Sequence, residues 1–137
     1  MNDIFNAFSI SASGMYAQRI RMNTIASNLA NYDSYTEEGV PFRRLEVVFR
    51  AVEDPEKLKK GEVPVRVEGI FESDEPFRMV YDPSHPMANE EGFVLKSNID
   101  LAKEMVNMIS ALRSYEANMT AFNMTRDMAE RTLELWK

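Results

Sequence analysis

The last 40 residues carry a hydrophobic repeat that only a long helix can place on one face. Mostly apolar side chains recur there at alternating intervals of four and three residues, over about five heptads. In a helix this spacing forms a continuous stripe, so it predicts a coiled-coil-like helix of roughly 55 Å. The positions on this stripe are Leu101, Met105, Met108, Leu112, Tyr115, Met119, Phe122, Arg126, Ala129, Leu133 and Trp136.

The first 31 residues repeat the same spacing less regularly. The positions are Ile4, Phe8, Ser11, Met15, Gln18, Met22, Ile25 and Leu29, of which two are polar. The run SISASG (9–14) also has low helix propensity. Because small residues let another backbone approach closely, we expect this helix either to pack tightly or to form only with a partner. The sequence leaves open whether the two end helices pair antiparallel or parallel.

The middle of the chain has a different composition. All six prolines and four of the five glycines fall between residues 32 and 97, where they exclude long helices. Strands are predicted at 43–52, 63–73, 77–81 and 92–96, with charged or proline-rich loops at 54–62 and 82–92. Ser97 and Asp100 resemble a capping box at the start of the last helix.

This layout predicts an α+β fold with three parts. Residues 1–31 and 98–137 form the two helices of one coiled-coil-like helical domain, and residues 32–97 form a small antiparallel β-rich domain between them.

The apolar face of the two helices is too broad for one partner helix to cover. Small or apolar residues also flank the stripe on both helices. They are Phe5, Ala7, Ala12, Ala26, Ala102, Ile109 and Ala111. Exposed apolar surface of this extent usually marks an interface, and methionine suits a surface that must adapt to several neighbours. We therefore expect a subunit whose ends pack against other subunits.

Charge and composition exclude several other classes of protein. The net charge of -6 argues against a nucleic-acid partner. The chain has no cysteine, so it has no disulfide and no thiolate metal site. The N-terminal segment is unlike a Sec-type signal peptide, and no apolar run is long enough to insert directly into a membrane. These features predict a cytosolic protein, or one that leaves the cytosol by a route that reads no cleaved signal.

The only histidine, His85, lies in the segment YDPSHPMA with Asp82 and Ser84 close by in sequence. An enzyme could be imagined around these groups, but the members of a triad converge from distant segments. A structural turn is the preferred interpretation, and changing His85 to glutamine would separate the two. No catalytic residue, metal site, cofactor or small-molecule substrate is predicted.

The basic residues have plain explanations. The lysines of segment 57–60 lie among acids, which favours a solvated loop over a nucleic-acid site. Arg43 and Arg44 are expected on the outer face of a strand. Arg126 interrupts the apolar stripe, where it either sets register against an acid on a neighbour or extends into solvent near the helix end.

Asparagines in the helices require a separate explanation, because their amides compete with the helical backbone for hydrogen bonds. Asn28 and Asn31 end the first helix in the segment IASNLAN, and Asn118 lies on the last helix. One interpretation is that Asn28 and Asn118 flank the stripe and fix the register of a neighbouring subunit. For Asn31 we favour helix capping at the C′ position.

Two segments resemble the terminal signatures of bacterial flagellar rod and hook proteins. They are GMYAQRIRMNTIASNLAN (14–31) and EMVNMISALRSYEANMTAFNMTRDM (104–128), the second of which contains Glu116 and Asn118. The segment VYDPSHPMANEEGFV (80–94) narrows the resemblance to a proximal rod member of this family. The resemblance covers nearly the whole chain, and residues 50–75 match least.

This resemblance implies a structural subunit that transmits motor torque to the hook and filament. Such proteins are cytoplasmic before export, leave through the flagellar type III export apparatus, and assemble helically into the rod that crosses the periplasm. Their partners are copies of themselves and other proximal and distal rod proteins. Their terminal helices form an inner tube, and their middle parts lie outside it. A soluble adaptor that binds partner helices is the alternative from a different class.

Overall fold

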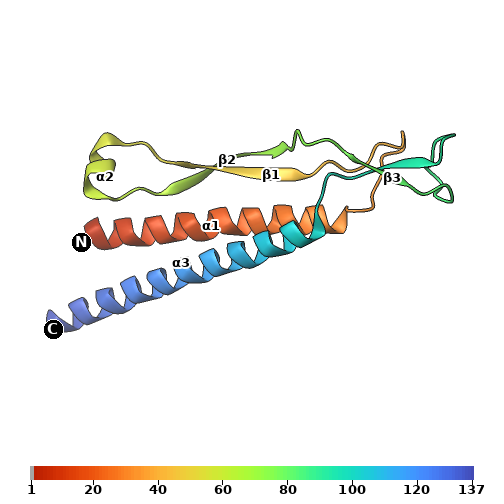
Figure 1. The fold of residues 1–137 in the computed structure, drawn as a ribbon. Helices are drawn as coiled ribbons and strands as arrows, with labels where there is room; N and C mark the ends of the chain where they lie inside the picture. Colours follow the sequence, from red (N-terminus) through yellow and green to blue (C-terminus); the bar gives the residue numbers. More distant parts are fainter. Residues whose placement is uncertain (1) are drawn as a thin grey trace.

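The computed structural model describes residues 2–137 and shows three layers (Figure 1). A long β-ribbon, helix α1 and helix α3 lie one above another, with α1 in the middle. The elements in chain order are α1 (Asn2–Ala30), β1 (Leu45–Ala51), α2 (Pro55–Lys60), β2 (Val65–Glu72), β3 (Arg78–Tyr81), β4 (Phe93–Lys96) and α3 (Leu101–Leu135). The α+β fold predicted from the sequence is confirmed.

The two long helices are antiparallel and diverge toward the end of the chain (Figure 1). Near the start of α1, the rings of Phe8 and Phe122 lie 4.8 Å apart between centroids. Near its end, Asn28 contacts Glu104 in the first turn of α3. Helix α1 is continuous through the run SISASG, and Gly14 within that run packs closely against α3.

The strands form two separate antiparallel sheets of two strands each. In the first, β1 pairs with β2 from Leu45 opposite Glu72 to Ala51 opposite Val65, with a bulge at Val48/Phe49. In the second, β3 pairs with β4. All four predicted strands are present. The first sheet lies along α1 as a ribbon rather than apart from it, since both of its strands contact that helix.

Two local predictions were wrong. Segment 54–62 contains the short helix α2 instead of a loop. The Asp54 carboxylate caps it by accepting from the Glu56 amide, Pro55 provides its first residue, and Gly61 ends it with φ at 72°. These are ordinary signals for the start and the end of a helix. The prediction of a loop was based on the charges of the segment instead.

The capping box predicted from Ser97 and Asp100 at the start of α3 is not formed. The N-cap of α3 is Asp100, whose carboxylate accepts from the Lys103 amide at 3.2 Å. The Ser97 hydroxyl instead donates to the Phe42 carbonyl, which ties the start of α3 to the segment before β1.

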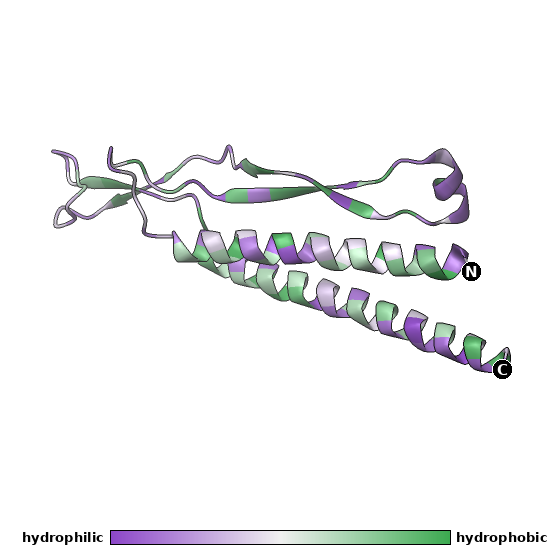
Figure 2. Cartoon of the chain, turned by 180° about the vertical axis from the view of Figure 1, so that it is seen from behind, coloured by the Kyte–Doolittle hydropathy of each residue, from purple (hydrophilic) through white to green (hydrophobic). Residues whose placement is uncertain are grey.

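The hydrophobic core of the single chain is small. Within residues 2–137 the fully buried apolar residues are Ala17, Ile25, Val94, Ile99 and Ala111. Figure 2 shows apolar residues distributed along both long helices, and many large ones on α3 are solvent-exposed. The described chain therefore leaves apolar surface that only another molecule can cover.

Candidate subunit interface

Small and polar residues form the line of closest contact between α1 and α3. Gly14 lies so close to Asn118 that a Cβ on residue 14 would be 2.3 Å from the Asn118 Oδ1 atom. Ala111 and Glu104 of α3 are completely buried. Asn118, Ala111 and Glu104 each come one residue before a member of the predicted stripe. One residue corresponds to a rotation of about 100° around an α-helix, so these side chains point in a different direction from the stripe.

The predicted stripe is consequently displaced to the edge of the helix pair. Its exposed apolar members on α3 are Leu101, Met105, Leu112, Met119 and Leu133, at 38–62% accessible, and Trp136 follows the helix at 85%. The half-buried members are Met108, Tyr115, Phe122 and Ala129 on α3, and Ile4, Phe8, Met15, Gln18, Met22 and Leu29 on α1. On α1 only Ile25 and Ser11 of the stripe are fully buried.

Part of this stripe borders a groove between the two long helices. The groove is lined by Ala12, Met15, Tyr16, Arg19 and Tyr115. It lies on the flank of α1 away from the β-ribbon, which contacts the helix through residues such as Ser13 and Asn28. The structure thus brings stripe residues of both helices to one open groove.

A buried polar junction sets the position of the ribbon on the helices. The side chain of Asn28 is fully buried. Its amide accepts a hydrogen bond from the Leu45 backbone N–H and donates one to the Leu45 carbonyl, both at 2.9 Å. It also donates to the Glu104 carboxylate at 3.3 Å. One side chain of α1 therefore holds β1 and α3 together.

Arg44 completes the junction. Its guanidinium pairs with the buried Glu104 carboxylate and with Glu46. Burial alone would lower the pKa of Arg44, but hydrogen bonding and the negative charges of Glu104 and Glu46 outweigh it and raise the pKa above its ordinary value. The prediction that Arg44 lies on the outer face of a strand was wrong, because its guanidinium pairs with the buried Glu104 of α3.

Arg43 is likewise occupied rather than free in solvent. It donates to the Ser73 and Glu75 carbonyls and lies 4.2 Å from the centroid of the Phe77 ring. Asn98 bonds both the Arg44 amide and the Glu75 carbonyl. The sequence analysis did not predict a role for Glu104 or Asn98, since an acid in the first turn of a helix is common and gave no signal of burial.

The asparagines expected to set register have partners inside this chain. Asn28 bonds β1 and α3 as described, and the Asn118 amide donates to the Ser114 carbonyl at 2.8 Å. Both lie in the helix contact rather than beside it. Asn31 follows the last residue of α1 and donates to the Ser27 carbonyl at 2.9 Å. Asn31 therefore caps the helix through its side chain. A cap with a left-handed backbone is excluded, because within residues 2–137 only glycines have positive φ.

The other motif positions lie on the outside of α3. Glu116 is exposed. Arg126 is exposed and pairs with Asp127 at 3.1 Å and Glu130 at 3.9 Å on its own helix. The register role predicted for Arg126 concerns an acid on a neighbouring subunit, so it stays a prediction.

His85 lies in a turn, where its ring supports the backbone. Its Nδ1 atom accepts from the Met87 amide at 3.1 Å, and its ring lies 5.8 Å from that of Tyr35. The Asp82 carboxylate accepts from the Ser84 hydroxyl at 2.7 Å, which lowers the pKa of Asp82. We expect a strain that carries His85→Gln in place of the natural chain to keep its normal phenotype, with an unchanged circular dichroism spectrum of the purified variant. Complete loss of the natural chain's function with normal folding would contradict this structural assignment.

The terminal segments match known families. A model described as flagella basal body rod protein matches residues 8–37, and one described as flagellar basal body rod FlgEFG protein C-terminal matches residues 90–135. Together with the pair of long end helices and the β-rich middle of the chain, these matches define a flagellar basal-body rod protein. A flagellar basal-body rod protein FlgC of Aquifex aeolicus is 58% identical over 137 residues, covering all of both chains.

More distant relatives bear the same name. Flagellar basal-body rod proteins FlgC of Bacillus subtilis and Salmonella typhimurium are 42% and 41% identical, over 97% and 96% of this chain and 98% and 97% of theirs. The chain belongs to the FlgC family. It is a structural subunit of the flagellar basal-body rod, where it assembles with other rod components, and it is not an enzyme. Across residues 2–137, no helix is both long and apolar enough to span a membrane.

Proposed function

We propose that this subunit occupies the proximal rod, that it is exported by the flagellar type III apparatus without a cleaved signal, and that it transmits motor torque. In this proposal residues 1–31 and 98–137 form the axial domain that packs against neighbouring subunits, and residues 32–97 lie outside it. The observation that supports it most is the exposed apolar stripe on α3, which the chain itself leaves uncovered.

Torque requires subunits that neither slip nor separate under load. The stripe residues supply apolar area for packing between subunits, while the Asn28 junction fixes how the ribbon is held on the helices. Burial of a large apolar side chain contributes about 1.5–3 kcal/mol. Several such side chains in each contact would hold the subunits together against the load.

We expect Leu112→Glu to prevent incorporation into the rod while leaving the monomer folded. Leu112 is 47% exposed, so a carboxylate there remains hydrated in the monomer but would be buried at the proposed interface. The measurement is peptide mass spectrometry of detergent-extracted basal bodies, together with circular dichroism of the purified variant. Val106→Glu is the matched control, since Val106 lies on the same helix, is 64% exposed and is outside the stripe.

The outcomes separate the parts of the proposal. Normal incorporation of Leu112→Glu would show that the stripe does not form the interface. Absence of the unmodified chain from intact basal bodies would contradict the rod position itself. Retention of the unmodified chain after removal of hook and filament, with loss of Leu112→Glu alone, is the expected result.

A further inference from the structure

The small sheet of β3 and β4 has one apolar face that the chain leaves open. The opposite pairs on this face are Met79 with Leu95 and Tyr81 with Phe93. Met79, Tyr81 and Leu95 are 66%, 65% and 45% exposed, and the ring centroids of Tyr81 and Phe93 lie 5.3 Å apart. On the other face, Val94 is buried. We name Met79, Tyr81, Phe93 and Leu95 the sheet patch.

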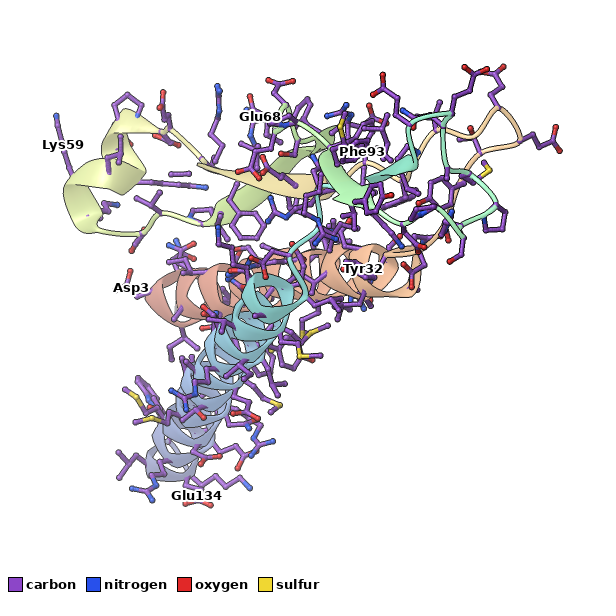
Figure 3. All side chains as sticks on the ribbon, turned by 45° about the vertical axis from the view of Figure 1, so that its right-hand side comes forward. Asp3, Tyr32, Lys59, Glu68, Phe93 and Glu134 are labelled. Carbon is purple, nitrogen blue, oxygen red and sulfur yellow. The ribbon has the colours of Figure 1, made fainter. Side chains whose placement is uncertain are left out.

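The sheet patch is separate from the apolar stripe of the long helices. Figure 1 shows the sheet beyond the end of α1, at the end of the molecule away from both chain termini. In Figure 3 the sheet is marked by Phe93, and the end of α3, marked by Glu134, lies on the other side of the molecule. Among the elements of residues 2–137, β3 contacts only β4. Packing of the long helices would therefore leave this sheet accessible.

The backbone of the sheet patch points outward at both edges of the sheet. The Asp82 N–H donates to the Gly92 carbonyl at 2.9 Å, which fixes the phase of the hydrogen-bonded ladder. The two pairs of the sheet patch are then the pairs without mutual hydrogen bonds. In an antiparallel sheet, the N–H and C=O groups of such pairs point away from each other.

The two edges differ in what meets these groups. At the edge of β4, the Asn89 side chain accepts from the Phe93 N–H at 2.9 Å, and the Asn89 N–H donates to the Phe93 carbonyl at 2.9 Å. The Tyr35 hydroxyl donates to the Leu95 carbonyl at 2.9 Å. At the edge of β3, no bond from the described residues reaches the backbone of the two patch members. The edge of β3 is therefore open, and the edge of β4 is closed.

Acidic side chains surround this end of the molecule. Segments 32–41 and 74–96 carry eight acids and two bases, a net charge of -6, which equals that of the whole chain. Among the described residues, the one acid of this set in an ion pair is Asp33, which lies 3.8 Å from Lys96. The other base, Arg78, donates to a backbone carbonyl and to a tyrosine hydroxyl. The acids are Asp33, Glu37, Glu38, Asp74, Glu75, Asp82, Glu90 and Glu91.

An open strand edge beside an apolar face can accept a further strand, whose backbone supplies hydrogen bonds and whose alternate side chains supply specificity. The surrounding acids favour a basic partner. We propose that an extended segment of another protein, with more bases than acids, adds to the edge of β3. Its apolar side chains pack on the sheet patch, and its bases meet Asp74, Glu75 and Asp82, which flank β3. This inference rests on the proposed function, because the partner is expected in the basal body.

A second copy of this chain does not match this site. Residues 1–31, 42–73 and 98–137 carry net charges of +1, 0 and -1, so none of them complements the acidic end. Two acidic ends would repel each other. The densest group of bases is the lysines of α2, which lie among acids and in a helix that cannot add as a strand. The partner is therefore a different chain.

Photocrosslinking in basal bodies tests the contact. The photoreactive amino acid p-benzoylphenylalanine replaces Tyr81 and so keeps an aromatic ring on the sheet patch. After irradiation, linked peptides are identified by mass spectrometry. We expect a link to a segment of another basal-body protein that has more lysine and arginine than aspartate and glutamate. A link to a copy of this chain, a link to a neutral or acidic segment, or no link would overturn the proposal.

A proline on β3 tests whether the backbone edge is used. Met79→Pro removes one outward N–H and leaves the ladder to β4 complete, because proline is tolerated at a free edge. Met79→Ala is the matched control, which removes the side chain alone. In the photocrosslinking background we expect a loss of about tenfold for Met79→Pro and about twofold for Met79→Ala. Equal losses would exclude strand addition. Circular dichroism of the purified variants confirms that they are folded.

A charge reversal tests the basic character of the partner and leaves the sheet unchanged. We expect Asp74→Lys/Glu75→Lys to lower the linked fraction about tenfold. Glu53→Lys/Glu56→Lys is the matched control, since it changes the net charge equally at exposed positions near α2, at the other end of the ribbon. Equal linked fractions in the two variants would show that the acids beside β3 do not bind the partner.

The amount of chain in the same basal bodies separates this inference from the proposed function. If the chain is retained there and the expected link does not form, this inference fails and the rod function stands. If the unmodified chain is absent from intact basal bodies, the proposed function fails, and this inference fails with it.

Discussion

Replacing Gly14 with alanine will destabilise the helix pair, and replacing Asn118 with alanine at the same time will restore it. The added methyl group would lie 2.3 Å from the Asn118 Oδ1 atom. The Asn118 amide is also held by its bond to the Ser114 carbonyl, which limits how far it can move away. Overpacking of this kind costs about 1–3 kcal/mol. In the double variant the space is free, and alanine in place of glycine in a helix contributes about 1 kcal/mol.

Urea unfolding of the four proteins followed by circular dichroism measures this cycle. The expected order of stability places Gly14→Ala lowest and the double variant near or above the natural chain. Ala26→Val is the matched control, since it adds methyl groups at an exposed position of the same helix. If Gly14→Ala alone proves more stable than the natural chain, the close approach at this point is not limiting and the packing described above is wrong.

Replacing Arg44 with methionine will cost about 3–5 kcal/mol, a large part of the stability of an ordinary domain. Glu104 is completely buried, and without the guanidinium its carboxylate would keep only the hydrogen bond from Asn28. Arg50→Met is the matched control. Arg50 also pairs with an acid, Glu68, but its side chain is 52% exposed, so we expect a loss below about 1 kcal/mol.

A second change tests whether the charge is responsible. In Arg44→Met/Glu104→Met neither charge is buried, so most of the lost stability should return. If the double variant is as unstable as Arg44→Met, the contribution of Arg44 comes from its contact with Glu46 rather than from its pairing with Glu104. Thermal unfolding by calorimetry gives the comparison.

Much of the fold could be predicted because its signals are local. The four-three repeat requires a long helix at 101–135, and prolines confine the strands to the middle. The short helix α2 also had complete local signals in Asp54, Pro55 and Gly61, and it was missed only because the charges of the segment were given more weight.

The candidate interface was predicted less fully. The stripe residues were identified as a surface that one chain cannot bury, and several of them are indeed exposed. Which α3 residues face α1 could not be derived, because the repeat gives spacing and not the rotation of one helix against another. That rotation depends on where two backbones can approach closely, here at Gly14 and Asn118.

By itself, the sequence determined the types and order of the elements and an apolar surface larger than one chain can cover. Periodicity and turn residues act over a few positions, so they can be recognised without knowing the fold. Only the tertiary structure decided that Asn28, Arg44 and Glu104 meet, and that the stripe borders an open groove. These residues are separated by many positions in the chain, and their contacts exist only once the ribbon and both helices have packed together.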